Sequence, residues 1–264
     1  MTLQLLISTL DGGINSVADL LLPAREGVSY LVSWQHTLGA APVEVPRELR
    51  RPDVALLEMN GTGLSRNRNN TLRHATGDIL LIADDDCRYR AEWLDAVVAT
   101  FERHPTLALA TFQMTSALAP KSYPDHEFSH SGRRPRGYYV TSFEIALRRS
   151  AVQGVVSFDE RFGLGAPMLL GGEEELFVEA ACAAGLDCRY FPTVVVRHDH
   201  ATTRESRATV PGLLMARGAY LKLSRRYRRT ALLRPLLIAW RIHCRHHYPY
   251  GKALAHIYRG YTMV

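Results

Sequence analysis

The sequence lacks several features that define other classes of protein. Its four cysteines are scattered without a Cys-x-x-Cys pair, which argues against a disulfide framework and against a cysteine zinc site. No apolar run approaches the ~18 residues of a membrane-spanning helix, since the best, residues 232–240, is interrupted by Arg234 and Pro235. No cationic region precedes the first apolar stretch, so we expect no secretory signal. These absences predict a soluble, cytoplasmic protein.

Acidic residues are almost missing from the last quarter of the chain. Residues 201–264 hold 13 lysines and arginines and only Glu205 as an acid, a net charge of +12. Residues 1–200 hold 19 bases and 25 acids, a net charge of −6. A basic tail on an acidic body indicates contact with an anionic partner, such as a phospholipid surface, a polyphosphate or nucleic acid. The alternative is a solvated basic face that keeps the protein soluble.

Short apolar runs alternate with helical patterns over the first 200 residues. Helices are predicted between the runs, at residues 65–76 and 92–104. This alternation of strands and helices predicts an open α/β sheet that is mostly parallel. Further on, residues 120–137 read as a loop, 138–147 as a strand, 173–184 as a helix and 191–196 as a buried strand. We expect a domain over residues 1–200, divided at 118/119, and a basic helical extension over 201–264. The predicted strands of the first half are residues 3–8, 30–34, 54–57, 79–83 and 107–112.

Three consecutive carboxylates follow the predicted buried strand 79–83. Asp84, Asp85 and Asp86 repel one another unless a cation lies among them. The period of a strand places Asp84 and Asp86 on one side and Asp85 on the other. Two carboxylates with open positions beside them suit Mg²⁺ or Mn²⁺. The alternative is a solvated acidic turn.

Three blocks of sequence resemble family 2 glycosyltransferases with the GT-A fold. Residues 63–86, GLSRNRNNTLRHATGDILLIADDD, are similar to the nucleotide-sugar half, which ends in an Asp-x-Asp signature. FDERFG at 158–163 with GGEEELF at 171–177 is similar to the acceptor half, and FPTVVVRHDH at 191–200 to a late strand that delivers a histidine. The resemblance covers residues 1–200 in the family's order. It implies a GT-A-like, Rossmann-like sheet whose two halves are residues 1–118 and 119–200.

The resemblance also assigns residues that bind the donor and a divalent ion. It implies that Asp84, Asp86 and His198 are ligands of Mn²⁺ or Mg²⁺. The residues that it implies for the nucleotide-sugar are Thr9, Gln35, Arg68, Asn69, Asp84 and Asp85. The family's usual base-binding aspartate after the second strand is missing, because that region reads Ser33-Trp34-Gln35.

Two of these assignments compete with structural explanations. Arg68 shares a helix face with Leu64 and Leu72, so it is expected to point inward, either toward a phosphate or toward Asp78 or another internal carboxylate. His198 and His200 project to one side if the strand continues, and both can equally be polar residues at a strand end.

The catalytic base implied by the resemblance is Glu174. It lies in a run of three glutamates at a helix start, where the helix dipole favours carboxylates even without a function. The reaction implied is transfer of a sugar from a nucleoside diphosphate to an acceptor hydroxyl, with inversion, in polysaccharide or glycolipid assembly.

The expected partners follow from this reading. They are a nucleoside-diphosphate sugar, a glycan or lipid-linked glycan acceptor and, through residues 211–264, an anionic membrane surface; nucleic acid is not expected. The protein is then cytoplasmic, either free or peripheral on the inner face of the membrane. Two alternatives stay open: a nucleotidyltransferase acting on sugar phosphates, and a non-enzymatic nucleic-acid-binding protein.

Overall fold

The structure is a computed structural model that describes residues 1–118, 120–199 and 210–264. Its described residues form two compact units, which we treat separately. The first comprises Met1–Thr62, Arg66–Ser157 and Ala180–His200. The second comprises Gly63–Ser65, Phe158–Glu179 and, among the described residues that follow, 210–264. The predicted boundary between residues 200 and 201 stays a prediction, because residues 200–209 lie outside the described part of the chain.

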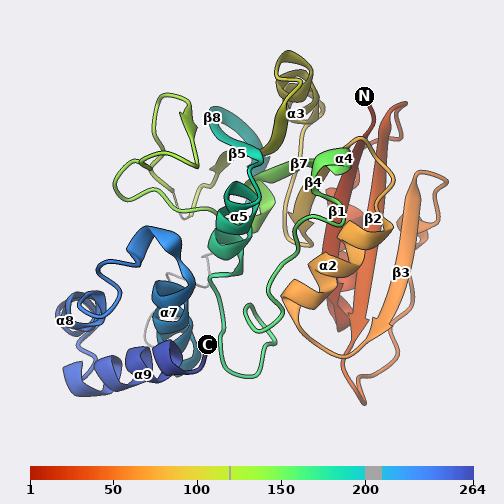
Figure 1. Cartoon of the computed structure of the whole chain (residues 1–264). Coiled ribbons are helices and arrows are strands. Elements are labelled where there is room, and N and C mark those ends of the chain that lie inside the picture. Colours follow the sequence, from red (N-terminus) through yellow and green to blue (C-terminus); the bar gives the residue numbers. More distant parts are fainter. Residues whose placement is uncertain (119, 200–209) are drawn as a thin grey trace. The chain divides into compact units, whose positions relative to one another are not determined.

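The first unit is built on an open sheet in the order β3-β2-β1-β4-β7-β5-β8-β6 (Figure 1). Among the described residues, four of the seven strand pairings are parallel, as expected, and β7 and β6 contribute the antiparallel ones. The strands are β1 (Leu3–Leu10), β2 (Val28–His36), β3 (Val54–Asn60), β4 (Ile79–Asp84), β5 (Leu107–Thr115), β6 (Phe128–Ser129), β7 (Ile145–Arg148) and β8 (Asp187–Arg197).

Alternation along β1 separates the two faces of the sheet. Leu3, Leu5 and Ile7 are fully buried in the main apolar core, which also holds side chains of α1 (Ile14–Val17) and α3 (Ala91–Arg103). Figure 1 shows α2 (Leu64–His74) lying across β1 and β2. Because helices cover the sheet, β4 is apolar at every position up to Ala83, as expected of a strand buried on both faces.

The segment predicted as one strand over residues 138–147 forms two different elements. A short 3-10 helix, Ser142–Glu144, precedes β7, and α4 (Arg149–Val152) follows it. The physical reason is a turn that Thr141 and Glu144 close: the Thr141 amide donates to Glu144 Oε2 across 3.1 Å, and the Glu144 amide donates to the Thr141 carbonyl oxygen across 3.2 Å.

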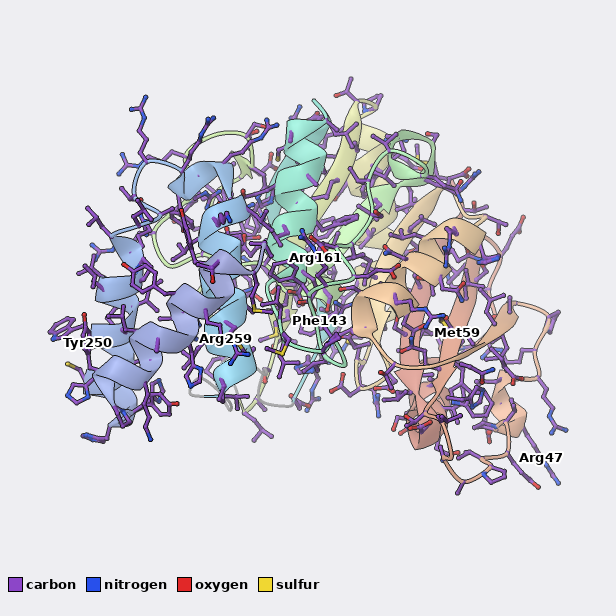
Figure 2. All side chains as sticks on the ribbon, turned by 60° about the horizontal axis from the view of Figure 1, so that its bottom comes forward. Arg47, Met59, Phe143, Arg161, Tyr250 and Arg259 are labelled. Carbon is purple, nitrogen blue, oxygen red and sulfur yellow. The ribbon has the colours of Figure 1, made fainter. Side chains whose placement is uncertain are left out.

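The second unit contains the helices α7 (Pro211–Leu223), α8 (Arg234–His246) and α9 (Tyr250–Thr262), together with the start of α5 (Glu173–Ala183). Figure 2 labels Tyr250 at the start of α9 and Arg259 near its end. The helix axes of α7 and α9 approach closely, because a Cβ at Gly218 would lie 1.7 Å from the Ile257 carbonyl oxygen and one at Gly260 would lie 1.8 Å from that of Met215. Glycine is therefore required at both positions. Among the described residues, no helix has the length and apolarity that a bilayer crossing demands.

Candidate active site

The polar cluster of the first unit lies at the carboxyl ends of its strands. β1 ends beside Thr9, β4 ends at Asp84, and His198 directly follows β8. In open α/β sheets this is the edge at which ligands bind. The sheet therefore brings together side chains that are far apart in the sequence.

Asp84 is held between a cation and a hydroxyl. Arg68 Nη2 donates to Asp84 Oδ1 across 2.9 Å, and Ser142 Oγ donates to Asp84 Oδ2 across 3.0 Å. The Arg68 side chain is 2% exposed, which confirms that it points inward. Asp84 is a carboxylate partner of Arg68, whereas the other predicted candidate, Asp78, accepts hydrogen bonds from Thr2.

Asp85 points back toward β1. Its Oδ2 accepts a hydrogen bond from Thr9 Oγ1 across 2.5 Å, and a Cβ at Gly13 would collide with both of these groups. The pKa of Asp85 is raised to about 6. Burial is the main cause, the Thr9 hydrogen bond acts in the opposite direction, and the neighbouring charges of Asp84 and Asp86 add to the rise. Asp85 is therefore protonated more readily than an ordinary aspartate.

Asp86 faces the histidine that follows β8. His198 Nε2 lies 3.1 Å from Asp86 Oδ2, and the His198 ring stacks on Phe143 with 4.6 Å between ring centroids. Burial lowers the pKa of His198, but the Asp86 hydrogen bond and the nearby carboxylates outweigh it, so the pKa lies above its ordinary value. His200, the second predicted histidine, lies outside the described residues.

The alternation expected for the three aspartates stays a prediction, because β4 supplies a strand period only as far as Asp84. β4 ends at Asp84, and the chain then turns, with the Cys87 amide donating to the Asp84 carbonyl oxygen across 3.2 Å. A strand period does not apply beyond its last residue. The three carboxylates consequently meet three different partners: Arg68, Thr9 and His198.

The remaining residues that the sequence predicts to bind the donor lie on α2 and the first two strands. Thr9 and Gln35 are 3% and 2% exposed, and Asn69 is also buried. Asn67, which sequence reasoning did not single out, donates from Nδ2 to the Thr9 carbonyl oxygen across 3.0 Å and so ties α2 to the end of β1. Its only signal in the sequence is its place in the motif that contains Arg68.

A second group that the sequence did not reveal anchors the 3-10 helix Ser142–Glu144. The Lys121 ammonium lies 2.7 Å from Glu144 Oε2, and both side chains are almost completely buried. Tyr123 also donates to Glu144, and the ammonium lies 4.2 Å from the centre of the Tyr139 ring. This ion pair fixes the element that presents Ser142 and Phe143 to the site. No local pattern marks it, because its partners come from a loop and a turn.

Whether the site suits a divalent ion depends on its oxygen and nitrogen donors. Among the described residues, no group of three or more His, Cys, Asp or Glu side chains is arranged to hold a metal. Asp86 and His198 nevertheless offer two adjacent donors, and Mg²⁺ sites commonly combine one or two carboxylates with water and substrate phosphates. The donor set therefore fits an ion that is completed by its substrate.

Glu174 lies in the second unit, at the start of α5. Of the three glutamates, Glu173 is buried at 3% exposure, whereas Glu174 and Glu175 are partly exposed. A Cβ at Gly163, which has a φ of +105°, would lie 3.2 Å from the Glu173 carboxylate. Glu173 is thus packed against the FDERFG turn, and its neighbours are the more accessible carboxylates.

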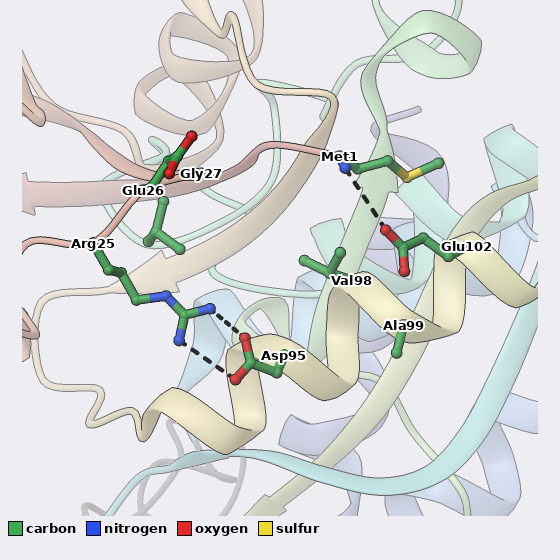
Figure 3. Close-up of a pocket in the computed structure, with 9 residues that line it drawn as sticks. Met1, Arg25, Glu26, Gly27, Asp95, Val98, Ala99 and Glu102 are labelled. Carbon is green, nitrogen blue, oxygen red and sulfur yellow. Dashed lines mark hydrogen bonds and ion pairs between the residues drawn. The ribbon is translucent and has the colours of Figure 1, made fainter.

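A cavity of about 260 Å³ lies at the opposite edge of the sheet, near Met1 and Val28 at the amino ends of β1 and β2. Figure 3 shows that ion pairs cross it, from Arg25 to Asp95 and from the Met1 amino group to Glu102. Because it is remote from the carboxyl ends of the strands, we do not assign the donor to it.

Comparison with known proteins points to the same segment. Residues 42–153 match the family described as Glycosyl transferase family 2. The Pre-mycofactocin glycosyltransferase of Mycobacterium tuberculosis is 30% identical over 152 residues, which cover 53% of this chain and 31% of that protein. The chain thus spans about a third of the length of the curated relatives it matches.

Solved structures show the fold. The crystal structure of S. aureus TarS 1-349 has a TM-score of 0.59 at 15% identity, covering 99% of this chain and 90% of that one. The same protein in complex with UDP-GlcNAc has a TM-score of 0.58, also at 15% identity, with 99% and 91% covered. These comparisons confirm the predicted resemblance to family 2 glycosyltransferases and the GT-A-like fold.

Proposed function

We propose that this chain, whose residues 42–153 match family 2 glycosyltransferases, moves a sugar from a nucleoside-diphosphate sugar to an acceptor hydroxyl. One observation carries the proposal. The matched segment contains Asp84, Asp85 and Asp86, and these carboxylates meet Thr9 and His198 at the edge where such sheets bind ligands.

The donor is expected to bind with a divalent ion, Mn²⁺ or Mg²⁺. Asp86 and His198 would hold the ion, with Asp84 as the third expected ligand. A bound ion would neutralise the negative charge that develops on the departing diphosphate. The residues that bind the nucleotide are expected to be Thr9, Gln35, Arg68, Asn69, Asp84 and Asp85.

The chain's own residues orient this site before the donor arrives. Arg68 and Ser142 fix both oxygens of Asp84, and Thr9 fixes Asp85. Such preorganised groups need little rearrangement as the reaction proceeds. Arg68 would also offer a positive charge to a phosphate held by an ion beside Asp84, because its guanidinium carries several donors in a fixed fork.

The acceptor hydroxyl needs a base, and we assign that role to Glu174. Among the three adjacent glutamates, the packing of Glu173 leaves Glu174 and Glu175 as the accessible carboxylates. Direct attack of an activated hydroxyl on the sugar carbon would invert the configuration. The acceptor proposed is a glycan or a lipid-linked glycan in polysaccharide or glycolipid assembly.

Uridine nucleotides are the first donors to test. A solved structure with the same fold holds UDP-GlcNAc and another holds UDP. We would measure the melting temperature of the protein with UDP, GDP, CDP and dTDP and their sugars, each with Mn²⁺, Mg²⁺ or EDTA. A rise for one nucleotide that requires the metal supports the proposal.

The control for this screen is Asp95→Asn, which removes a carboxylate at the opposite edge of the sheet. It should keep the nucleotide-dependent rise in melting temperature, whereas Asp86→Asn should lose it. If no nucleotide stabilises the protein with either metal, the donor assignment fails.

A further inference from the structure

Large apolar side chains are exposed on one side of α8. Their exposed fractions are 67% for Leu233, 40% for Leu236, 59% for Leu237 and 57% for Trp240. The spacing of three, four and seven residues places them on one stripe of the helix. Leu232, one residue before Leu233, is 63% exposed as well. Scattered exposed leucines are ordinary, but a contiguous stripe of this kind marks a contact surface.

The opposite side of α8 is already packed. Pro235, Ala239 and Ile242 are buried, and the last two join a cluster with Leu214 of α7 and Ile257 of α9. The exposed stripe is therefore not needed to hold the three helices together. It is a second apolar face with no partner in the described part of the second unit.

The stripe belongs to a segment of the chain that is rich in positive charge. Arg241 and Arg245 are exposed on the same helix, and a cluster of exposed arginines precedes it. No Asp or Glu occurs anywhere from residue 210 to residue 264. The arginines of the preceding cluster are Arg225, Arg226, Arg228 and Arg229.

The charge near the stripe and the length of α8 together indicate which kind of partner covers the stripe. A second copy of this face would bring like charges together, whereas a surface of anionic lipid headgroups is complementary to it. The 13 residues of α8 span only about 20 Å, too short for the hydrocarbon core. A helix with apolar and aromatic residues on one stripe and arginines beside it instead lies in the plane of the interface.

We propose that the α8 stripe, defined as Leu233, Leu236, Leu237 and Trp240, binds the surface of an anionic lipid bilayer. The apolar side chains enter the boundary between headgroups and acyl chains. Arg241 and Arg245 contact the headgroup phosphates, and the arginine cluster adds long-range attraction. The sequence predicts a membrane contact somewhere within residues 211–264; the structure narrows it to one stripe of one helix. This inference does not depend on the identity of the donor.

The test uses the full chain and sedimentation with vesicles of phosphatidylcholine, with and without about one-third phosphatidylglycerol. The wild-type protein should bind the vesicles that contain phosphatidylglycerol and should not bind the vesicles of phosphatidylcholine alone. Leu233→Ser/Leu237→Ser and Arg241→Gln/Arg245→Gln should each weaken binding at least about tenfold. The matched control is Leu38→Ser, because Leu38 is fully exposed in the first unit and lies outside the stripe. It should bind as the wild type does.

Two further measurements keep the outcomes distinct. Trp240 fluorescence should shift to shorter wavelength with anionic vesicles and should lose this shift in Trp240→Phe, while thermal unfolding verifies that each variant is folded. The proposal would be overturned if the wild-type protein did not bind the anionic vesicles. It would also be overturned if the Leu233→Ser/Leu237→Ser variant bound them as tightly as the wild type. A concentration-dependent dimer that this variant abolishes would overturn it too, because a second copy would then cover the stripe. Nucleotide binding is measured on the same samples, so failure of the donor assignment is recognised separately.

Discussion

Arg68 donates through Nη2 to Asp84 Oδ1 across 2.9 Å, so a buried cation holds the first carboxylate of the aspartate triplet. The pair joins α2 to the end of β4. It means that the triplet is partly neutralised by the protein itself before any ligand binds.

Removing this cation should destabilise the fold. Arg68→Ala leaves Asp84 beside two other carboxylates, with the Ser142 hydroxyl as a remaining hydrogen-bond donor. Breaking a buried ion pair typically costs about 3 to 5 kcal/mol, and we expect a value in this range by urea unfolding. Arg66→Ala on the same helix is the control, because Arg66 is exposed. Equal stability of the two variants would contradict the role of the pair.

Asp85 should make the apo protein less stable as the pH rises. Its pKa is about 6 in the folded chain against an ordinary 3.8, so the folded state binds the proton more tightly. The free energy of unfolding should therefore decrease as the pH rises from about 4 to about 6, by on the order of 2 to 3 kcal/mol for a pKa shift of this size. In EDTA, Asp85→Asn should be the more stable protein near neutral pH, and its advantage should shrink toward about pH 4.

Urea unfolding across this pH range checks the prediction. Asp11→Asn is the comparison, since hydrogen bonds from Thr37 lower the pKa of Asp11 and its replacement should bring no gain at neutral pH. A pH-independent difference between wild type and Asp85→Asn would show that burial does not raise the pKa of Asp85.

The contact between α7 and α9 should tolerate no side chain at its two glycines. Gly218→Ala places a methyl group against the Ile257 carbonyl oxygen, so the helices must separate. Overpacking of this kind costs about 1 to 3 kcal/mol or more. Gly251→Ala, also on α9, meets nothing within 4 Å and should stabilise the helix slightly. Thermal unfolding that ranks the two variants in the opposite order would show that the helices do not pack so closely.

Glu174→Gln should separate catalysis from donor binding. If Glu174 takes the acceptor proton, turnover should fall by about 10² to 10⁴-fold while nucleotide affinity is retained. Glu175→Gln is the control, because consecutive helical residues point about 100° apart. A turnover close to that of the wild type in Glu174→Gln would remove the assignment.

Local sequence patterns predicted the framework of the first unit. Buried apolar runs such as residues 79–83 indicate strands directly, and the helical periodicity of residues 92–104 matches α3 closely. The prediction of one strand over residues 138–147 failed because this segment depends on a turn closed by Thr141 and Glu144 and on antiparallel pairing with strands distant in sequence. Periodicity carries no information about either.

The site was predicted less completely than the fold. The triplet and Arg68 stand in a recognisable motif, but the directions of Asp85 and Asp86 follow from a turn that begins where β4 ends. Ser142 and Phe143 reach Asp84 and His198 only because β7 enters the sheet between β4 and β5. Contacts of this range depend on the assembled sheet and have no local signal.

The most direct test of the central claim is a crystal grown with Mn²⁺ and UDP, examined for the anomalous scattering of manganese. We predict a peak between the diphosphate and the side chains of Asp86 and His198, with the uridine toward Thr9 and Gln35. A nucleotide that binds elsewhere, or an Asp86 that keeps only protein contacts with manganese present, would contradict the account.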